Sequence, residues 1–316
     1  MRLGIGLWCL QSTATAPRSF ARAYEELIDD ALLAERVGLD SIWLSEHHGF
    51  YDGYCPALMP AAGAVLQATS SLRVGTAVLL LPLQRPERVA AAAGELHRGS
   101  GGRFELGVGM GYRPTEFAAK GLDMAERRTL LEGGLDAIGR LGDDGIPLWV
   151  GVTSVPAARR AGRRGLGLFI SGAFAKEVVD ELVAAHRGAW QEAGEPGVRP
   201  PPVGLLRNIW LADSATARRQ AAEWVRSSYL VYAGLGWGAR DTGVDFVAEI
   251  GSSMDEVEAS ALIGSAEEVA TALDVYEGVE LIVCRVGYDQ PPRNALIEVI
   301  ERIGTELRPL VGELNQ

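Results

Sequence analysis

The chain has 316 residues, 47% of them hydrophobic, with a formal net charge of −11 and a sequence pI of about 5.0. The length fits one large α/β barrel or two ordinary domains with a sizeable core. The acidic balance argues against nucleic acid as a partner. The longest apolar runs fall short of the roughly 20 residues that a transmembrane helix needs, which argues against a membrane protein.

The cysteines indicate an intracellular setting. Cys9, Cys55 and Cys284 stand far apart and form no CxxC pair, so we predict reduced thiols in the core or in strands. The N-terminal MRLGIGLW enters a strand without a signal-peptide pattern. We therefore predict a cytoplasmic protein.

Short β-like runs alternate with amphipathic stretches along the chain. Strands are predicted at 3–8, 40–46, 72–81, 103–109, 146–151, 166–172, 202–212 and 279–287. A first helix is predicted from residue 20 to a C-cap at Gly38, and others at about 57–69, 86–96, 125–140, 175–193 and 292–307. In the helix at 175–193, the pattern predicts that Val178, Val179, Leu182 and Val183 face inward.

Eight strands alternating with helices predict a (β/α)8 TIM barrel that forms a single domain over residues 1–316, in preference to a doubly wound sheet. Residues 228–264 break the rhythm before the eighth strand, with a run rich in glycine and aromatic residues. We interpret this segment as an insertion that acts as a lid or substrate loop, and a packed surface loop or dimer contact is the alternative.

The pair His47–His48 closes the second predicted strand in a chain with only four histidines. Side chains alternate along a strand, so Ile42 and Leu44 should face the helices, while Trp43 and His47 face the barrel axis. His47 then lies at the C-terminal end of a barrel strand, where barrel enzymes hold their chemistry. An imidazole there is a candidate acid or base. Adjacent histidines are poor joint metal ligands and no other cluster has ligand spacing, so we predict no metal.

Two other strand ends carry candidate binding features. In the fourth strand, Gly107 and Gly109 should face inward and leave room for a flat aromatic ring. After the fifth strand, Thr153 and Ser154 precede a helix whose first turn includes Pro156. Hydroxyls and N–H groups at a helix N-terminus suit a phosphate, although Ser154 taken alone is better explained as a plain N-cap.

Four segments in order resemble the bacterial luciferase-like monooxygenase family of flavin-dependent barrels. They are WLSEHH (43–48), GTAVLLLPLQRP (75–86), SGGRFELGVGMGY (100–112) and EFAAKG (116–121). The resemblance implies an FMN site at the C-terminal mouth of the barrel and a non-prolyl cis peptide at Ala77–Val78. It implies that His47 is the catalytic base.

The resemblance also implies the remaining cofactor contacts. The ring should pack on the third and fourth strands, and the phosphate should meet Thr153, Ser154 and the backbone after Gly109. Met110 stands where luciferase has an arginine for the phosphate, and Arg113 is a possible substitute. Tyr112 is predicted to lie at the cofactor, with Trp8, Tyr51, Tyr54 and Trp237 as candidates for the pocket wall.

The activity implied by the resemblance is oxygenation of a small organic substrate. Reduced FMN from a separate flavin reductase would react with O2 to give a C4a-peroxyflavin. A coenzyme F420-dependent oxidoreductase that transfers hydride, and a non-catalytic luciferase-like subunit, remain alternatives. The family also implies a homodimer.

Overall fold

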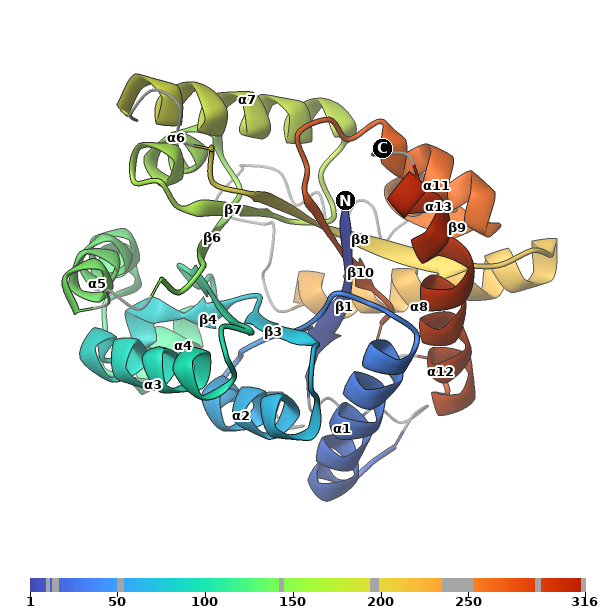
Figure 1. The fold of residues 1–316 in the computed structure, drawn as a ribbon, viewed down its shortest axis with the longest axis horizontal. Helices are drawn as coiled ribbons and strands as arrows, with labels where there is room; N and C mark the ends of the chain where they lie inside the picture. The colour runs from blue at the N-terminus through green and yellow to red at the C-terminus, as the bar shows by residue number, and fades with distance from the viewer. Residues whose placement is uncertain are drawn as a thin grey trace.

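The computed structural model describes residues 1–9, 12, 17–49, 54–141, 145–193, 199–234, 253–287 and 291–313. Parallel strands form a barrel at the centre of the molecule (Figure 1). The strands are β1 (Arg2–Trp8), β2 (Ser41–Leu44), β3 (Arg73–Thr76), β4 (Leu79–Leu80), β5 (Phe104–Gly109), β6 (Leu148–Val152), β7 (Gly167–Ile170), β8 (Val203–Leu211) and β10 (Leu281–Arg285). Strand β10 pairs with both β1 and β8 and so closes the barrel, while β4 continues the line of β3 beside β5.

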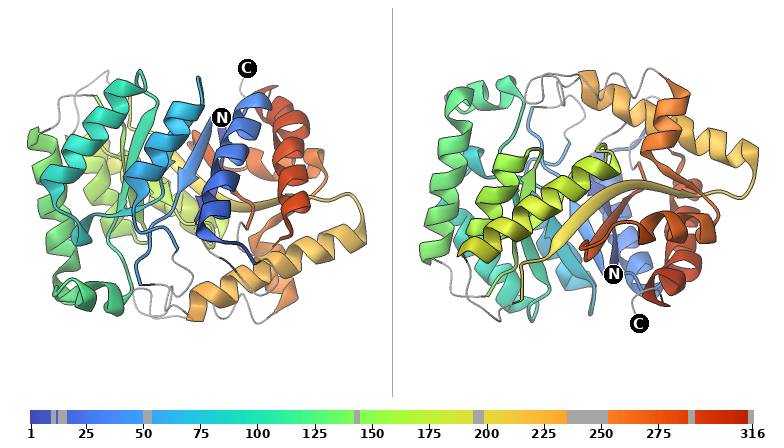
Figure 2. Two further views of the ribbon diagram at one scale, coloured as in Figure 1. Left: turned by 90° about the horizontal axis from the view of Figure 1, so that it is seen from below. Right: turned by 90° about the horizontal axis from the view of Figure 1, so that it is seen from above.

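Helices surround the barrel, as Figures 1 and 2 show. They are α1 (Phe20–Arg36), α2 (Leu58–Ala68), α3 (Pro86–Gly99), α4 (Pro114–Ala119), α5 (Arg127–Leu141), α6 (Val155–Arg163), α7 (Lys176–Ala193), α8 (Ala215–Gly234), α10 (Met254–Ser260), α11 (Ala266–Asp274), α12 (Arg293–Arg302) and α13 (Arg308–Glu313). Short turns lie at η1 (Leu81–Leu83), η2 (Met124–Glu126) and η3 (Ile303–Leu307). The predicted TIM barrel is therefore confirmed, and each of the eight predicted strand ranges overlaps a barrel strand.

The predicted insertion at 228–264 is built partly from regular elements. Residues 228–234 are the last turns of α8, and α10 with β9 (Leu262–Gly264) forms its other end. Strand β9 pairs with the end of β8, from Ile209 to Leu211. Figure 2 shows α8, in gold, at the end of the molecule opposite the N-terminus. The stretch 235–252 between these ends lies outside the described residues, so its role as a lid stays a prediction.

An aromatic cluster fills the barrel interior. The ring of Trp43 lies 5.8 Å from that of Trp149, edge to face, and 5.3 Å from that of Phe169. A β-carbon at Gly75 would lie 2.3 Å from the Trp43 ring, so only glycine fits beside it on β3. Ile42 and Leu44 pack outward into the main core, as the alternation predicts. In α7, however, Val178 is 36% exposed, so its predicted inward position is wrong.

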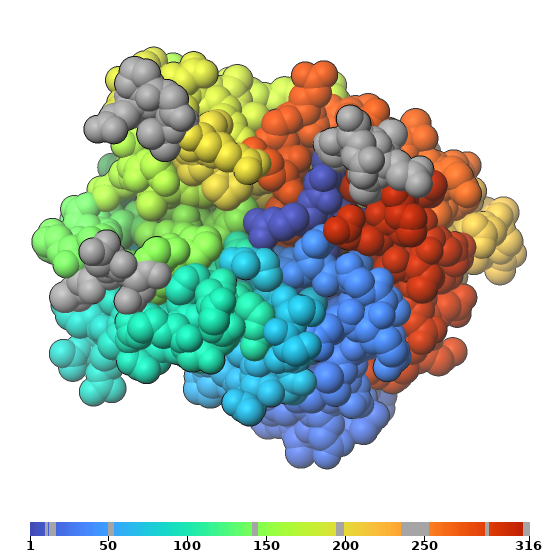
Figure 3. All heavy atoms as spheres, in the orientation of Figure 1, coloured from blue at the N-terminus to red at the C-terminus, as the bar shows by residue number. Residues whose placement is uncertain are grey.

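A polar cluster closes the N-terminal end of the barrel. The carboxylate of Glu105, which is 1% exposed, accepts hydrogen bonds from Arg2 (2.8 Å), from Arg73 and from the Trp149 indole (2.7 Å). Burial raises the pKa of Glu105, but the two arginines outweigh it and the net shift is downward. Figure 3 views this end, where the first residues, in dark blue, lie near the centre of the face. Because this polar cluster plugs the N-terminal end of the barrel, we expect a ligand to bind at the C-terminal end.

A carboxylate at the end of α1 orders the approach to β3. Glu35 Oε1 accepts from the N–H groups of Ser70 (2.9 Å), Ser71 (2.6 Å) and Leu72 (3.0 Å) and from the Ser71 hydroxyl. The little burial at this site raises the pKa of Glu35, but these donors outweigh it and lower the pKa to about 2. Folding therefore favours the charged form of the Glu35 carboxylate.

Glu35→Gln is expected to lower the unfolding free energy at pH 7 by about 1 kcal/mol. We expect less than the pKa shift alone would imply, because Glu35 is only half-buried and water screens its charge. A depressed carboxyl pKa stabilises the fold above the unfolded value of 4.5 and loses that effect as pH falls toward 2. Urea unfolding at several pH values between 3 and 7 checks this. A variant that unfolds with the same pH slope as the parent contradicts it.

Candidate active site

His47 lies just beyond the C-terminal end of β2 and is 4% exposed. Its Nδ1 lies 2.9 Å from Glu116 Oε1, and its Nε2 lies 3.1 Å from the hydroxyl of Tyr112. A carboxylate only accepts, so Nδ1 carries the proton and Nε2 accepts from the phenol when the ring is neutral. This is the arrangement of an acid–base imidazole oriented by a carboxylate.

Glu116 comes from α4, 69 residues further along the chain, and its side chain is fully buried. Its Oε1 also accepts from the backbone N–H of His48 at 2.8 Å. Burial raises the pKa of Glu116, but the hydrogen bond and charge of His47 outweigh burial and the net shift is downward. Glu116 is therefore an ionised acceptor for the Nδ1–H of His47. The sequence analysis gave this residue no role.

A second buried carboxylate, Glu46, fixes the loop that carries the histidines. Glu46 Oε1 accepts from His48 Nε2 (2.5 Å) and from the Gln84 amide (2.7 Å), while Oε2 accepts from the Leu80 N–H (2.7 Å). These bonds join the end of β2 to β4 and η1. His48 thus has a structural partner, whereas His47 faces the site.

Two tyrosine rings flank the imidazole. The rings of Tyr54 and Tyr112 both stand edge to face with His47, at centroid distances of 4.8 and 5.2 Å. The Tyr54 hydroxyl bonds to Ser45 (3.1 Å) and to the hydroxyl of Tyr232 in the last turns of α8. The helix that leads into the predicted insertion therefore contacts the candidate active site directly.

Arg285 comes from β10 and completes this side of the barrel mouth. Leu281 and Val283 line the barrel interior, so the alternation along β10 also turns Arg285 inward. Its guanidinium lies 4.7 Å from the centre of the Tyr232 ring and donates to the Ser228 hydroxyl at 2.5 Å. The end of α8 is thus bound to Tyr54, in the connection between β2 and α2, and to Arg285 of β10.

The predicted cofactor residues on the third and fourth strands lie together, but not as expected. The Ala77–Val78 peptide is cis, as predicted. A β-carbon at Gly109 would lie 2.3 Å from Val78 Cγ2, and one at Gly107 would lie 1.9 Å from the Thr76 carbonyl oxygen. The idea that these glycines leave open space for a ring is therefore wrong, because Val78 and the β3 backbone fill it. The half-exposed Val78 side chain is the surface available to a ligand there.

The predicted phosphate contacts lie at the N-terminus of α6. Thr153 and Ser154 are exposed, and Ser154 occupies the N-cap position without a side-chain capping bond. The first N–H groups of a helix have no partner within it, so they and the two hydroxyls are oriented to receive an anion. Met110 is partly buried against the main core.

Other predicted residues have different surroundings. Arg113 donates to the His48 carbonyl (2.9 Å) and lies 3.5 Å from Glu116, so it supports the loop that carries the histidines. Trp8 is buried in the main core and packs on Tyr24 of α1, so its predicted place in the pocket wall is wrong. Tyr51 and Trp237 lie outside the described residues.

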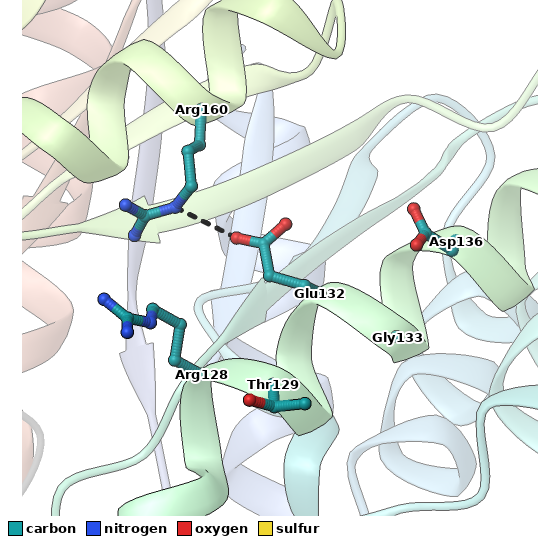
Figure 4. Close-up of a pocket in the computed structure, with 6 residues that line it drawn as sticks. All are labelled: Arg128, Thr129, Glu132, Gly133, Asp136 and Arg160. Atoms are coloured by element: carbon teal, nitrogen blue, oxygen red, sulfur yellow. Dashed lines mark hydrogen bonds and ion pairs between the residues drawn. The ribbon is translucent and has the colours of Figure 1, made fainter.

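A charged depression on the outer surface between α5 and α6 is separate from the barrel mouth (Figure 4). Its lining comprises Arg128, Thr129, Glu132, Gly133, Asp136 and Arg160. Ion pairs of Arg160 with Glu132 (3.0 Å), and of Arg164 with Glu132 (2.8 Å) and Asp136 (2.5 Å), join the two helices. Arg160 of α6 and Arg164 at its C-cap therefore have acidic partners on α5.

The three cysteines are buried free thiols. Within the described ranges, no group of three or more His, Cys, Asp or Glu side chains could hold a metal ion. Among the helices of those same ranges, none is long and apolar enough to cross a membrane.

The family model of luciferase-like monooxygenases matches residues 1–144 and 133–280, and the chain belongs to this family of oxidoreductase enzymes. It is 29% identical over 280 residues to 4-hydroxyprotoasukamycin monooxygenase of Streptomyces nodosus subsp. asukaensis, covering 77% of this chain and 74% of that protein. It is 32% identical to an uncharacterised protein, y4vJ, of Sinorhizobium fredii, covering 62% of this chain and 63% of that protein.

Solved structures agree on the fold. Monooxygenase RslO1 of Streptomyces bottropensis has a TM-score of 0.82 at 22% identity, with 98% of this chain and 99% of that chain covered. The oxygenating constituent of 3,6-diketocamphane monooxygenase from Pseudomonas putida, in complex with FMN, has a TM-score of 0.78 at 20% identity. An F420-dependent secondary alcohol dehydrogenase has a TM-score of 0.76 at 19% identity. Each of these two matches covers 98% of both chains.

Proposed function

We propose that this protein is a flavin-dependent monooxygenase that uses reduced FMN and O2 to oxygenate a small organic substrate at the C-terminal mouth of the barrel. The main support is the His47–Glu116 pair, an oriented acid–base group at the strand ends where TIM-barrel enzymes act. Membership of the luciferase-like monooxygenase family supports the reaction class. The reduced flavin, when bound, supplies the electrons that activate O2.

The residues at the mouth fit FMN at both of its ends. The exposed hydroxyls of Thr153 and Ser154 and the free N–H groups of α6 suit the phosphate. Ala77 and the side chain of Val78 offer an apolar surface for the ring, beside the chain from Gly109 to Tyr112. The plugged N-terminal end of the barrel and the packed end of α8 limit the access of water to this region.

His47 moves the protons. With Glu116 ionised against Nδ1, the imidazole can accept a proton at Nε2 and return it later in the cycle. Supply of reduced FMN by a separate reductase, a homodimeric assembly, a lid over 228–264 and a cytoplasmic location remain predictions from the sequence.

Ser154→Asp tests the cofactor assignment. Aspartate caps a helix as well as serine does, so α6 should stay intact, but its charge repels a phosphate at the same N-terminus. We expect FMN to bind at least about 10-fold more weakly, which corresponds to about 1.4 kcal/mol, while riboflavin, which has no phosphate, keeps its affinity. Flavin fluorescence titrations of the parent, Ser154→Asp and the matched control Ser154→Ala measure this.

An equal loss for FMN and riboflavin, or no loss for either, would contradict the phosphate position. F420 is titrated in parallel, because a structural neighbour binds it. Tight binding of F420 with no binding of FMN would favour the alternative, hydride transfer. Product formation that continues without O2 would exclude oxygenation.

A further inference from the structure

We propose that the hydroxyl of Tyr112, and not the imidazole of His47 itself, is the group that exchanges protons with the reactants at the barrel mouth. This inference rests on the proposed function and assigns the acid–base work to a second residue. His47 and Glu116 then act behind the phenol. The order from the mouth inward is Tyr112, His47 and Glu116.

The first argument is that both nitrogens of the His47 ring already have partners. Nδ1 is bonded to Glu116 and Nε2 to the Tyr112 hydroxyl. The ring is also 4% exposed and is flanked edge to face by Tyr54 and Tyr112. A reactant can reach Nε2 only if it displaces the phenol. The phenol oxygen is therefore the nearer point of contact.

The second argument is the position of Tyr112. It follows the C-terminal end of β5 by three residues and is half-buried, so it is more accessible than His47. Burial first, then Tyr232 and Glu116, raise the pKa of Tyr112 well above its usual value, while Arg113 and Arg285 act in the opposite direction. Its hydroxyl thus lies among side chains from α4, α8 and β10. A phenol with a raised pKa is a neutral donor at working pH.

The proton balance is simple in both directions. With a neutral imidazole, a reactant O–H gives its proton to the phenol oxygen as the phenol proton passes to His47 Nε2. The reactant becomes an anion, and the ring becomes an imidazolium paired with the Glu116 carboxylate. In reverse, Nε2–H passes its proton to the phenol oxygen as the phenol proton returns to a reactant oxygen. No electrons move in either step, and Tyr112 is a neutral phenol before and after.

Imidazole nitrogen NMR on the cofactor-free protein tests the geometry, since the chain has only four histidines. His47→Asn identifies the His47 signals. At a pH where the ring is neutral, we expect Nδ1 to carry the proton and Nε2 to show an accepted hydrogen bond. Tyr112→Phe should move the Nε2 signal toward that of an unbonded nitrogen. The matched control, Tyr54→Phe, removes a hydroxyl that bonds to Ser45 and Tyr232 and should leave the signal in place. A proton on Nε2, or no change in Tyr112→Phe, overturns the relay.

The oxidation of bound reduced FMN by O2 tests the chemistry without a substrate. The overall change, FMNH2 plus O2 giving FMN plus H2O2, transfers two electrons and requires proton transfer. Tyr112→Phe, saturated with FMN, should slow H2O2 release at least about 10-fold and flatten its pH profile. Release at the parent rate, from a variant that still binds FMN, overturns the relay and leaves the proposed function standing. A parent protein that binds no FMN overturns the proposed function and this use of Tyr112 with it.

Discussion

Replacement of His47 by alanine is expected to lower kcat by about 10²–10⁴-fold, the range of an acid–base group, while the dissociation constant of FMN changes by less than about threefold. The reason is that His47 bonds to Glu116 and Tyr112, whereas the predicted phosphate contacts are Thr153 and Ser154 at the start of α6. The side chain is deep in the site and its role is proton transfer, not cofactor binding. Single-turnover oxygenation with reduced FMN, together with an FMN titration, separates the two effects.

The matched control is the neighbouring residue. His48→Ala removes one of three donors to Glu46, and the Leu80 N–H and Gln84 amide remain. Its backbone N–H still bonds to Glu116. We expect its kcat to fall about 10-fold or less. Equal losses in the two variants, or a loss of FMN binding that accounts for the whole effect in His47→Ala, would show that the loop as a whole and not the His47 imidazole is needed.

The barrel could be predicted from the sequence because its signals are local. Each strand is a short apolar run, and alternation placed Trp43 inside the barrel and His47 at its mouth. The same alternation along β10 turns Arg285 inward beside Val283, a signal that the sequence analysis did not use. The start of the predicted insertion was harder to place, because α8 continues through its first residues, 228–234.

The partners of His47 could not be predicted, because the fold brings them together from distant segments. Glu116 lies 69 residues away on α4, and Tyr232 lies 178 residues from its partner Tyr54. A glutamate near the start of a short helix has the pattern of an ordinary first-turn acid. Only the closure of the barrel shows that this one is buried against an imidazole.

The prediction that Gly107 and Gly109 of β5 leave open space was wrong for a similar reason, because the atoms that fill this space come from another segment of the chain. These glycines also give a prediction of a large effect on stability. Gly107→Ala should destabilise the protein by about 3 kcal/mol or more, because its β-carbon would lie 1.9 Å from the Thr76 carbonyl oxygen. That oxygen belongs to the backbone of β3. Gly107 also exchanges two hydrogen bonds with the Thr76 hydroxyl, at 2.7 and 2.9 Å. The two strands therefore cannot separate without losing these bonds, and urea unfolding measures the cost.

Gly109→Ala provides the contrast on the same strand. Its β-carbon would meet a side chain, at 2.3 Å from Val78 Cγ2 and 3.2 Å from Val78 Cβ. Removal of the Val78 methyl groups leaves only the milder contact, so Val78→Ala should restore most of the stability lost in Gly109→Ala. It should restore none in Gly107→Ala, where the conflict is with the backbone. Rescue of both variants, or of neither, would show that Val78 does not occupy the space over Gly109. The ring of the cofactor would then have to rest on the glycine itself.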